Sequence, residues 1–381
     1  MTADNSQNLA RLLSEMIHIN TVAPPGNEKD LATYIADILR SNGFNPIVQD
    51  LGDNRANITC EIGEGDDCRL ILNGHLDVVP AEGEWNHEPF SGTVDGDCLF
   101  GRGACDMKAG LCCMLQAFID TAKESNKLRG RLKLVFVADE ETSNLGLRSY
   151  LSKYNENDRK TAKRNYAVIG EPTELHVCNS HYGVERYWIN IHGESAHSSK
   201  PELGVNAIVG ASSVVESLGA YHKELRTRVT EWGSPSCAVT MIEGGEKQNS
   251  IPAHARVFID RRTVPGERAD DVKREVESWI ETKTDLKGCR SDVELYFTFA
   301  SGLLPSTNSF LSEVLGLNSQ EKPEVFPAGC EQAIMLAHGY EALVLGPGSI
   351  KDAHMPDEKV RIEDLGKAYE LYRKIITKIL M

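Results

Sequence analysis

Residues 132–141 read LKLVFVADEE, an apolar run that ends in three consecutive acidic residues, Asp139, Glu140 and Glu141. A continuous apolar run of this length is typical of a strand that is buried on both faces of a sheet. Carboxylates this close repel one another and are costly at the end of a buried strand, unless a cation or a reaction requires them. The stretch therefore predicts a buried strand with a functional site at its end.

Similar apolar runs occur at 69–77, 166–172 and 341–348. Helical patterns of apolar spacing occur at 8–22, 28–44 and 108–124. Short apolar strands that alternate with helices indicate an α/β fold, with a mostly parallel sheet covered by helices.

The middle of the chain has a different order of elements. Strand-like patterns lie at 184–193, 236–245 and 255–264, and helical patterns lie at 204–227 and 269–284. This β-α-β-β-α order indicates a smaller α+β domain that is inserted into the larger one. We expect the larger domain at 1–179 and 294–381, and the inserted domain at 180–293.

Composition excludes several classes of partner. The net charge of −15 argues against nucleic acid and anionic membranes, which attract basic patches. No apolar run approaches the roughly 20 residues that cross a bilayer, and the N-terminus lacks the pattern of a signal peptide. We therefore expect a cytoplasmic protein whose ten scattered cysteines are free thiols, with Cys105 and Cys330 notable because each stands beside an acidic residue.

Candidate metal ligands follow the predicted strands, at the sheet edge where functional side chains gather in open α/β sheets. They are His75, Asp106, Glu141, Glu171 and His354. Each alone would more commonly be a turn or cap residue, but five coincide. Imidazoles and carboxylates without thiolates suit a catalytic zinc or cobalt site, and one such zinc takes about three protein ligands. Five ligands therefore predict two metal ions that share one bridging carboxylate and together activate a water and polarise a carbonyl.

Two acidic positions have roles beside these ligands. Asp77 lies two residues after His75 on the same face of a strand, so we expect it to orient the imidazole. The side chains of Glu140 and Glu141 should diverge, so that one binds metal and the other serves as general base. Asp139 is then expected to be a turn or supporting residue.

Six motifs in this order resemble the signatures of the M20 metallopeptidase and deacylase family: GHLDVVP, GRGACDMKAG, ADEETS, IGEPT, GESAHSSKPELGVNAI and LGPGSIKDAHMPDE. The resemblance covers essentially the whole chain. It implies that one metal ion is held by His75, Asp106 and Glu171, and the other by Asp106, Glu141 and His354. It also implies that Glu140 is the general base. Zinc, cobalt and manganese all fit these ligands, zinc being expected first.

The resemblance further implies a homodimer formed by the inserted domain, which would also act as a lid. His197 would reach the partner's active site and stabilise the oxyanion, while Asn249 and Arg262 would contact the substrate carboxylate and the dimer interface. A glutamate rather than an aspartate at Glu171 accompanies deacylases and carboxypeptidases in this family, and disfavours an aminopeptidase.

The expected substrate is an N-acyl amino acid, with N-acetylornithine of arginine biosynthesis first and Glu331 meeting its ammonium group. N-succinyl-diaminopimelate is the nearest alternative, although the segment PAGCEQ differs from the corresponding pattern of the enzymes that act on it. Tyr182 stands where related deacylases carry a basic residue, which weakens any assignment of the acyl pocket. Aminoacylase, carboxypeptidase, dipeptidase and carbamoylase activities share the same chemistry. A binding module without turnover is disfavoured by the complete ligand set and by Glu140.

Overall fold

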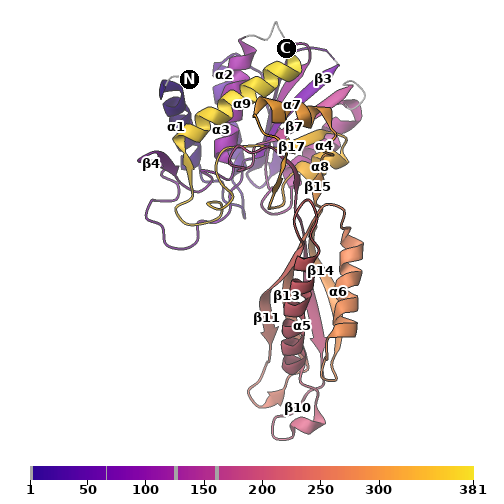
Figure 1. Ribbon diagram of the computed structural model, residues 1–381. Coiled ribbons are helices and arrows are strands. Elements are labelled where there is room, and N and C mark those ends of the chain that lie inside the picture. The colour runs from indigo at the N-terminus through magenta and orange to yellow at the C-terminus, as the bar shows by residue number, and fades with distance from the viewer. Residues whose placement is uncertain (1–2, 66, 124–127, 159–162) are drawn as a thin grey trace. The chain divides into compact units, whose positions relative to one another are not determined.

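The computed structural model describes residues 3–65, 67–123, 128–158 and 163–381 (Figure 1). Two compact units divide the chain. The larger unit consists of Met1–Ser180, Leu303–Phe326 and Cys330–Met381, and the smaller consists of His181–Gly302 and Pro327–Gly329.

A nine-stranded mixed sheet forms the centre of the larger unit in the described part of the chain. Its order is β1-β2-β6-β3-β7-β17-β8-β15, with β16 beside β8. The neighbours β6, β3, β7 and β17 run parallel, whereas β1, β2 and β8 join antiparallel, which confirms the predicted α/β fold. The strands are β1 (Ile47–Gly52), β2 (Arg55–Ile62), β3 (Cys68–His75), β6 (Arg131–Val137), β7 (Arg164–Ile169), β8 (Cys178–His181), β15 (Gly302–Leu303), β16 (Glu324–Phe326) and β17 (Glu341–Val344).

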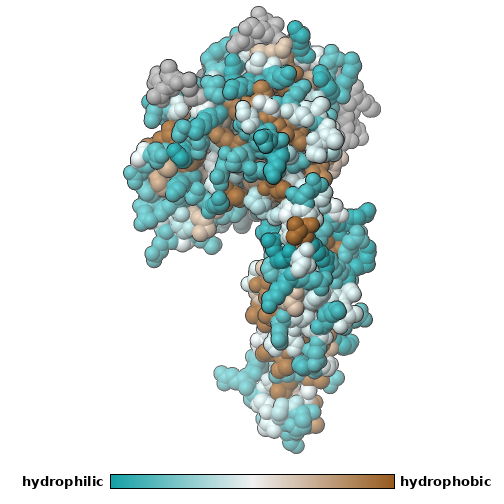
Figure 2. All heavy atoms as spheres, viewed as in Figure 1, coloured by the Kyte–Doolittle hydropathy of each residue, from teal (hydrophilic) through white to brown (hydrophobic). Residues whose placement is uncertain are grey.

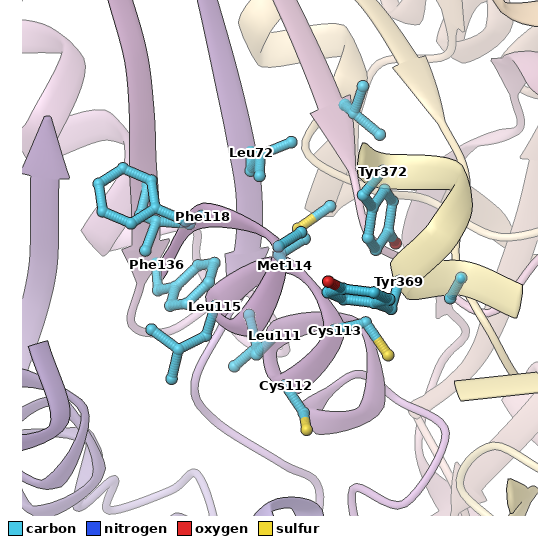
Figure 3. Packing of buried hydrophobic residues seen from close by; sticks show 14 of the residues in the cluster. Leu72, Leu111, Cys112, Cys113, Met114, Leu115, Phe118, Phe136, Tyr369 and Tyr372 are labelled. Carbon is cyan, nitrogen blue, oxygen red and sulfur yellow. The ribbon is translucent and has the colours of Figure 1, made fainter. Parts of the chain in front are cut away.

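Helices cover both faces of this sheet. Leu72 and Phe136 belong to the hydrophobic cluster that the sheet shares with α1, α3 and α9, and Figure 3 shows them against Phe118 of α3 and Tyr372 of α9. Lys133, one residue before Leu134, lies over the ring of Tyr150 of α4, because successive side chains of a strand point to opposite faces. The helices are α1 (Ala3–His18), α2 (Glu28–Ser41), α3 (Lys108–Ala122), α4 (Leu145–Asp158), α7 (Ser309–Leu317), α8 (Gln332–Ala337) and α9 (Ile362–Leu380).

Helix α3 is the most enclosed of these helices. Every residue from Lys108 to Leu115 is buried, as expected for a helix packed between a sheet and two other helices. It ends at Ala122, and Glu124, the last residue of the predicted helix, lies outside the described residues. A small three-stranded sheet of β4 (Thr93–Asp95), β5 (Cys98–Phe100) and β18 (Lys359–Arg361) completes this unit.

The smaller unit is an antiparallel sheet in the order β11-β13-β9-β14, with two helices on one face. Tyr187, Ile189 and Val257 form the core with α5 and α6. The main elements are β9 (Gly183–His192), α5 (Ala207–Thr227), β11 (Ser236–Gly244), β13 (His254–Thr263), α6 (Ala269–Lys283) and β14 (Arg290–Phe299), and the short ones are β10 (Ala196–His197), η2 (Pro201–Leu203) and β12 (Ser250–Ile251).

The observed end of the smaller unit differs from the expected domain boundary because of strand β14. The sequence pattern places the return to the larger domain at residue 294, but this position lies inside β14, which pairs with β9 from Arg290 to Phe299. The smaller unit therefore continues to Gly302. At the other end, the observed boundary after Ser180 lies one residue from the expected one.

Within the described residues, no helix combines the length and the apolar composition that crossing a bilayer requires.

Candidate active site

The carboxyl ends of the parallel strands bring the predicted ligands to one edge of the sheet. His75 is the last residue of β3, and the acidic run follows the end of β6 at Val137. Glu171 lies two residues after β7, and His354 lies in the loop between β17 and β18. Because β6, β3, β7 and β17 are parallel neighbours, their carboxyl ends lie side by side at one edge of the sheet.

Among the described residues, two groups could each hold a metal ion: His75, Asp106 and Glu171, and Asp106, Glu141 and His354. Within each group the ligand atoms lie within 4.8 Å of one another. Nε2 of His75 is 3.1 Å from Oδ1 of Asp106, and Nε2 of His354 is 3.3 Å from Oδ2 of the same carboxylate. Asp106 thus presents one oxygen to each group, which is the geometry of a bridging ligand.

The charges of the site fit a pair of divalent cations. Burial and the charge of Asp106 raise the pKa of Glu171 well above its usual range, and the same two causes raise the pKa of Glu141. Burial would lower the pKa of His354, but its bonds to Asp106 and Glu141 raise it to about 11. These shifts arise because several carboxylates are buried close together, which is unfavourable without compensating positive charge. Divalent cations bound by these oxygen and imidazole ligands would supply that charge.

Asp77 differs from its predicted role. Nδ1 of His75 bonds to the backbone carbonyl of Asp77 at 2.9 Å, whereas the carboxylate oxygen Oδ1 is 3.7 Å away. The carboxylate instead accepts the backbone N–H of Glu140 at 3.1 Å and that of Glu141 at 3.0 Å. Asp77 thus orients His75 through its backbone carbonyl, which leaves Nε2 of the imidazole to face a metal ion. The side chain of Asp77 holds the acidic turn in place.

Asp139 anchors that turn from within. It has a φ of 70°, in the left-handed region, and its carboxylate accepts bonds from the hydroxyls of Thr142 and Ser143. It also bonds Arg55 of β2, which pairs with the buried carboxylate of Glu28 at 2.8 Å. Sequence reasoning missed Arg55 and Glu28, because nothing in their local pattern links them to the acidic run.

Glu140 is half-buried beside the ligands. Burial raises the pKa of Glu140 well above its usual range; the charge of His75 opposes this rise and that of Glu141 adds to it. A raised pKa makes a carboxylate a stronger base, which suits Glu140 to general acid–base work.

A buried lysine lies under the loop of Asp106. Nζ of Lys108, the first residue of α3, donates to the backbone carbonyls of Met16 at 3.1 Å and Ile19 at 2.8 Å. Burial lowers the pKa of Lys108 to about 7. These bonds tie the end of α1 to the segment that carries Asp106.

The residues that were predicted to contact the substrate are distributed over both units. Glu331, at the start of α8, is fully buried in the larger unit and bonds Asn73 of β3, and burial raises its pKa to about 7. His197 and Asn249 lie together in the smaller unit, where both side chains are exposed and the Asn249 carbonyl accepts the N–H of Ser198 at 3.0 Å. In that unit, Arg262 pairs with Asp260 at 2.7 Å, and Tyr182 is half-buried.

All ten cysteines are free thiols. Cys105 and Cys330 are buried, and burial raises the pKa of each thiol well above its usual range. Neither is a ready nucleophile, because the reactive form of a cysteine is the thiolate.

Comparison with known proteins identifies the class. The model of peptidase family M20/M25/M40 matches residues 71–378. Acetylornithine deacetylase of Photorhabdus laumondii subsp. laumondii is 31% identical over 367 residues, covering 93% of this chain and 90% of that protein. The acetylornithine deacetylase of Vibrio cholerae is 30% identical over 371 residues, covering 93% and 92%.

The fold agrees with this relationship. A Bacillus subtilis structure described as a dinuclear metal-binding peptidase of the M20 family has a TM-score of 0.74 at 16% identity, covering 98% of both chains. The chain belongs to peptidase family M20 and is an amidohydrolase of that family.

Proposed function

We propose that the protein is a dinuclear metal-dependent deacylase that releases acetate and ornithine from N-acetylornithine, in the cytoplasm and as a step of arginine biosynthesis. The observation that carries the chemistry is the bridging position of Asp106 between two three-residue groups, with Glu140 beside them. The substrate is supported by the similarity of 30–31% to acetylornithine deacetylases over most of the chain.

Two divalent ions, zinc first and cobalt or manganese as alternatives, would be held by the two groups. Ions bound there would lower the pKa of a water and polarise the acyl carbonyl. The residues of the chain handle the proton and the geometry. Glu140 takes a proton from the attacking water and returns it to the leaving amine, since its raised pKa lets it hold that proton between the two steps. Asp77 holds Glu140 in place through the backbone N–H.

His197 of the partner subunit would donate a hydrogen bond to the oxyanion of the tetrahedral intermediate. Its exposed ring is compatible with this role, because Nδ1 accepts the N–H of Ser199 at 3.1 Å, which leaves Nε2 to carry the proton. Asn249, in the adjacent loop, would contact the substrate carboxylate together with Arg262.

We further propose that the chain forms a homodimer through its smaller unit. Strand β11 is an edge strand of the smaller unit, and its residues Met241 and Ile242 are about half exposed, at 49% and 55%. Ile208 and Val209 of α5 are also exposed. Figure 2 shows hydrophobic residues along the side of this unit on which β11 lies. An unpaired edge strand with exposed apolar side chains is suited to pairing with a second copy of the chain.

The most detailed part of the proposal concerns the two residues that would select the substrate, Glu331 and Tyr182. Oε1 of the enclosed Glu331 carboxylate has no hydrogen-bond partner among the described residues, which leaves it available to an ornithine ammonium that reaches it. Tyr182 would border the acyl group. Replacing Glu331 by Gln should raise KM for N-acetylornithine selectively, and an unchanged KM would exclude the ammonium contact.

The activity is tested with metal-stripped protein to which Zn(II) or Co(II) is added stepwise. The substrates are N-acetylornithine, N-succinyl-diaminopimelate, N-acetylmethionine and a dipeptide. We expect metal-dependent release of ornithine that exceeds turnover of the other three. Preferred turnover of another substrate would keep the mechanism and replace the specificity, and no turnover of any would refute the enzymatic proposal.

A further inference from the structure

The segment from His354 to Glu358 carries a ligand and two acidic residues that bind different loops. Asp357 is half-buried, whereas Glu358 is buried, with 1% of its surface exposed. Neither acid belongs to the two candidate metal groups. A carboxylate enclosed this completely requires partners, since an unpaired buried charge is strongly destabilising.

The partners of Glu358 lie next to the shared ligand. Its Oε1 accepts the backbone N–H of Cys105 at 2.9 Å and that of Asp106 at 3.0 Å. Its Oε2 pairs with Nη1 of Arg102 at 2.5 Å, and Arg102, also buried, donates to the carbonyl of Pro80 at 3.1 Å. Hydrogen bonds from N–H groups to a carboxylate are about twice as strong as neutral ones.

We infer that Glu358 is the positioning residue for the bridging carboxylate: it fixes the main chain of Asp106 and couples it to His354, so that both metal sites depend on it. This inference rests on the proposed metal site. Asp106 serves both groups, so any shift of its backbone moves an oxygen in each. The group with His354 depends on Glu358 twice, because the two residues are four apart on one segment.

The neighbouring acid provides a matched control. Asp357 accepts the backbone N–H of Asn86 at 2.9 Å and that of His87 at 3.0 Å. This is the same kind of contact, made by the same segment, to a loop that contributes no ligand to either group. If Glu358 merely stabilised the segment, removing the contact of Asp357 should have the same effect on metal binding.

The test uses metal-stripped wild-type protein and the variants Glu358→Ala, Glu358→Gln and Asp357→Ala. Each is titrated with Co(II), followed by visible absorption and calorimetry, and its fold is checked by circular dichroism. Loss of a residue that supports a metal ligand typically lowers affinity about 10- to 100-fold. We expect a loss of this size in Glu358→Ala for both ions, because Asp106 serves both groups.

The other two variants show whether the loss of metal affinity is specific to the contacts of Glu358. Glu358→Gln should lose less affinity, because its amide oxygen can still accept both N–H groups while its NH₂ faces Arg102. Asp357→Ala, which removes the contact to Asn86 and His87, should bind both ions as the wild type does. If Glu358→Ala does not fold, Glu358→Gln decides, with weaker binding of Co(II) than in the wild type as the expected result.

Two results would overturn the inference: folded Glu358 variants that bind both ions with wild-type affinity, or an equal loss in Asp357→Ala. Wild-type protein that binds no Co(II) would instead remove the proposed function, and this inference with it. Two ions bound with the same affinity by the wild type and by every variant would remove the inference alone.

Discussion

Replacing Asp77 by Asn distinguishes two roles for its carboxylate, which lies two residues after the candidate metal ligand His75. The carboxylate either orients the imidazole or holds the acidic turn. The carboxylate accepts two backbone N–H groups, those of Glu140 and Glu141, and its nearest oxygen is 3.7 Å from the imidazole of His75. Asparagine keeps one acceptor oxygen and places an NH₂ group where the second bond was. The geometry therefore predicts a displaced acidic turn and an unmoved His75.

The magnitude follows from the bond that is lost. A hydrogen bond to a charged group contributes about 1.5–3 kcal/mol. If this free energy is what holds Glu140 in its working position, kcat should fall by about 10- to 150-fold. The ion held by Asp106, Glu141 and His354 should bind more weakly, while the ion held with His75 should keep its affinity.

The assay combines kcat for the best N-acyl amino acid substrate with a Co(II) titration of the metal-stripped variant. Asp50→Asn is the charge-matched control, because Asp50 is exposed and accepts a backbone N–H from Gly52 at 2.9 Å on the surface. Selective loss of the ion bound with His75 would show that the side chain of Asp77 acts on the imidazole. An unchanged kcat would refute the reasoning altogether.

Three further predictions follow from the same geometry. Glu140→Gln should bind two ions but lose about 10²- to 10⁴-fold in kcat, as expected for a general acid–base group, and loss of an ion instead would make Glu140 a ligand. His197→Ala should lower kcat about 10²- to 10³-fold with an unchanged metal content, and mixing it with Glu140→Gln should restore activity if the histidine acts across a dimer. Burial lowers the pKa of His181 from 6.5 to about 4, so the unfolded chain binds the proton more readily than the folded one. Stability should therefore fall by up to about 3 kcal/mol between pH 6.5 and pH 4, and a chemical unfolding series with His181→Gln should show no such fall if this histidine is the cause.

The sequence predicted the sheet because its strands leave an unambiguous pattern. β3, β6 and β7 are buried on both faces, so their apolar runs are continuous and their ends are marked by the polar residues that follow. Because these strands run parallel, the residues at their carboxyl ends, His75 and Glu171 among them, lie at one edge of the sheet. This placement follows from the topology and not from the local sequence. The fold class followed from these features and the family from the resemblance of six motifs, and both are confirmed.

Strand β14 was missed for a physical reason. Its burial pattern is irregular: Val293 and Phe299 are buried, while Leu295 and Tyr296 between them are exposed. A bulge between Leu295 and Phe297 interrupts the alternation that marks a half-buried strand. The pattern of apolar residues therefore gave no clear strand beyond residue 293.

The supporting contacts of the site could not be predicted from residue types alone. Asp77 and Glu358 both act on backbone N–H groups, which every non-proline residue possesses and no sequence pattern marks. The partner of Asp139 is Arg55, which is 84 residues away on another strand. Such contacts depend on how the loops close, which becomes known only when the fold is complete.

The division of the chain into units also determines an order of folding. The smaller unit is almost entirely continuous, from His181 to Gly302, whereas the larger is built from segments that flank it. Helix α9, at residues 362–380, packs against α1, α3 and β3. As the chain leaves the ribosome, the smaller unit can therefore fold first, while α1 and α3 keep apolar surface exposed until α9 emerges. Nascent chains that stop before residue 362 should consequently depend on chaperones for their larger unit but not for their smaller one.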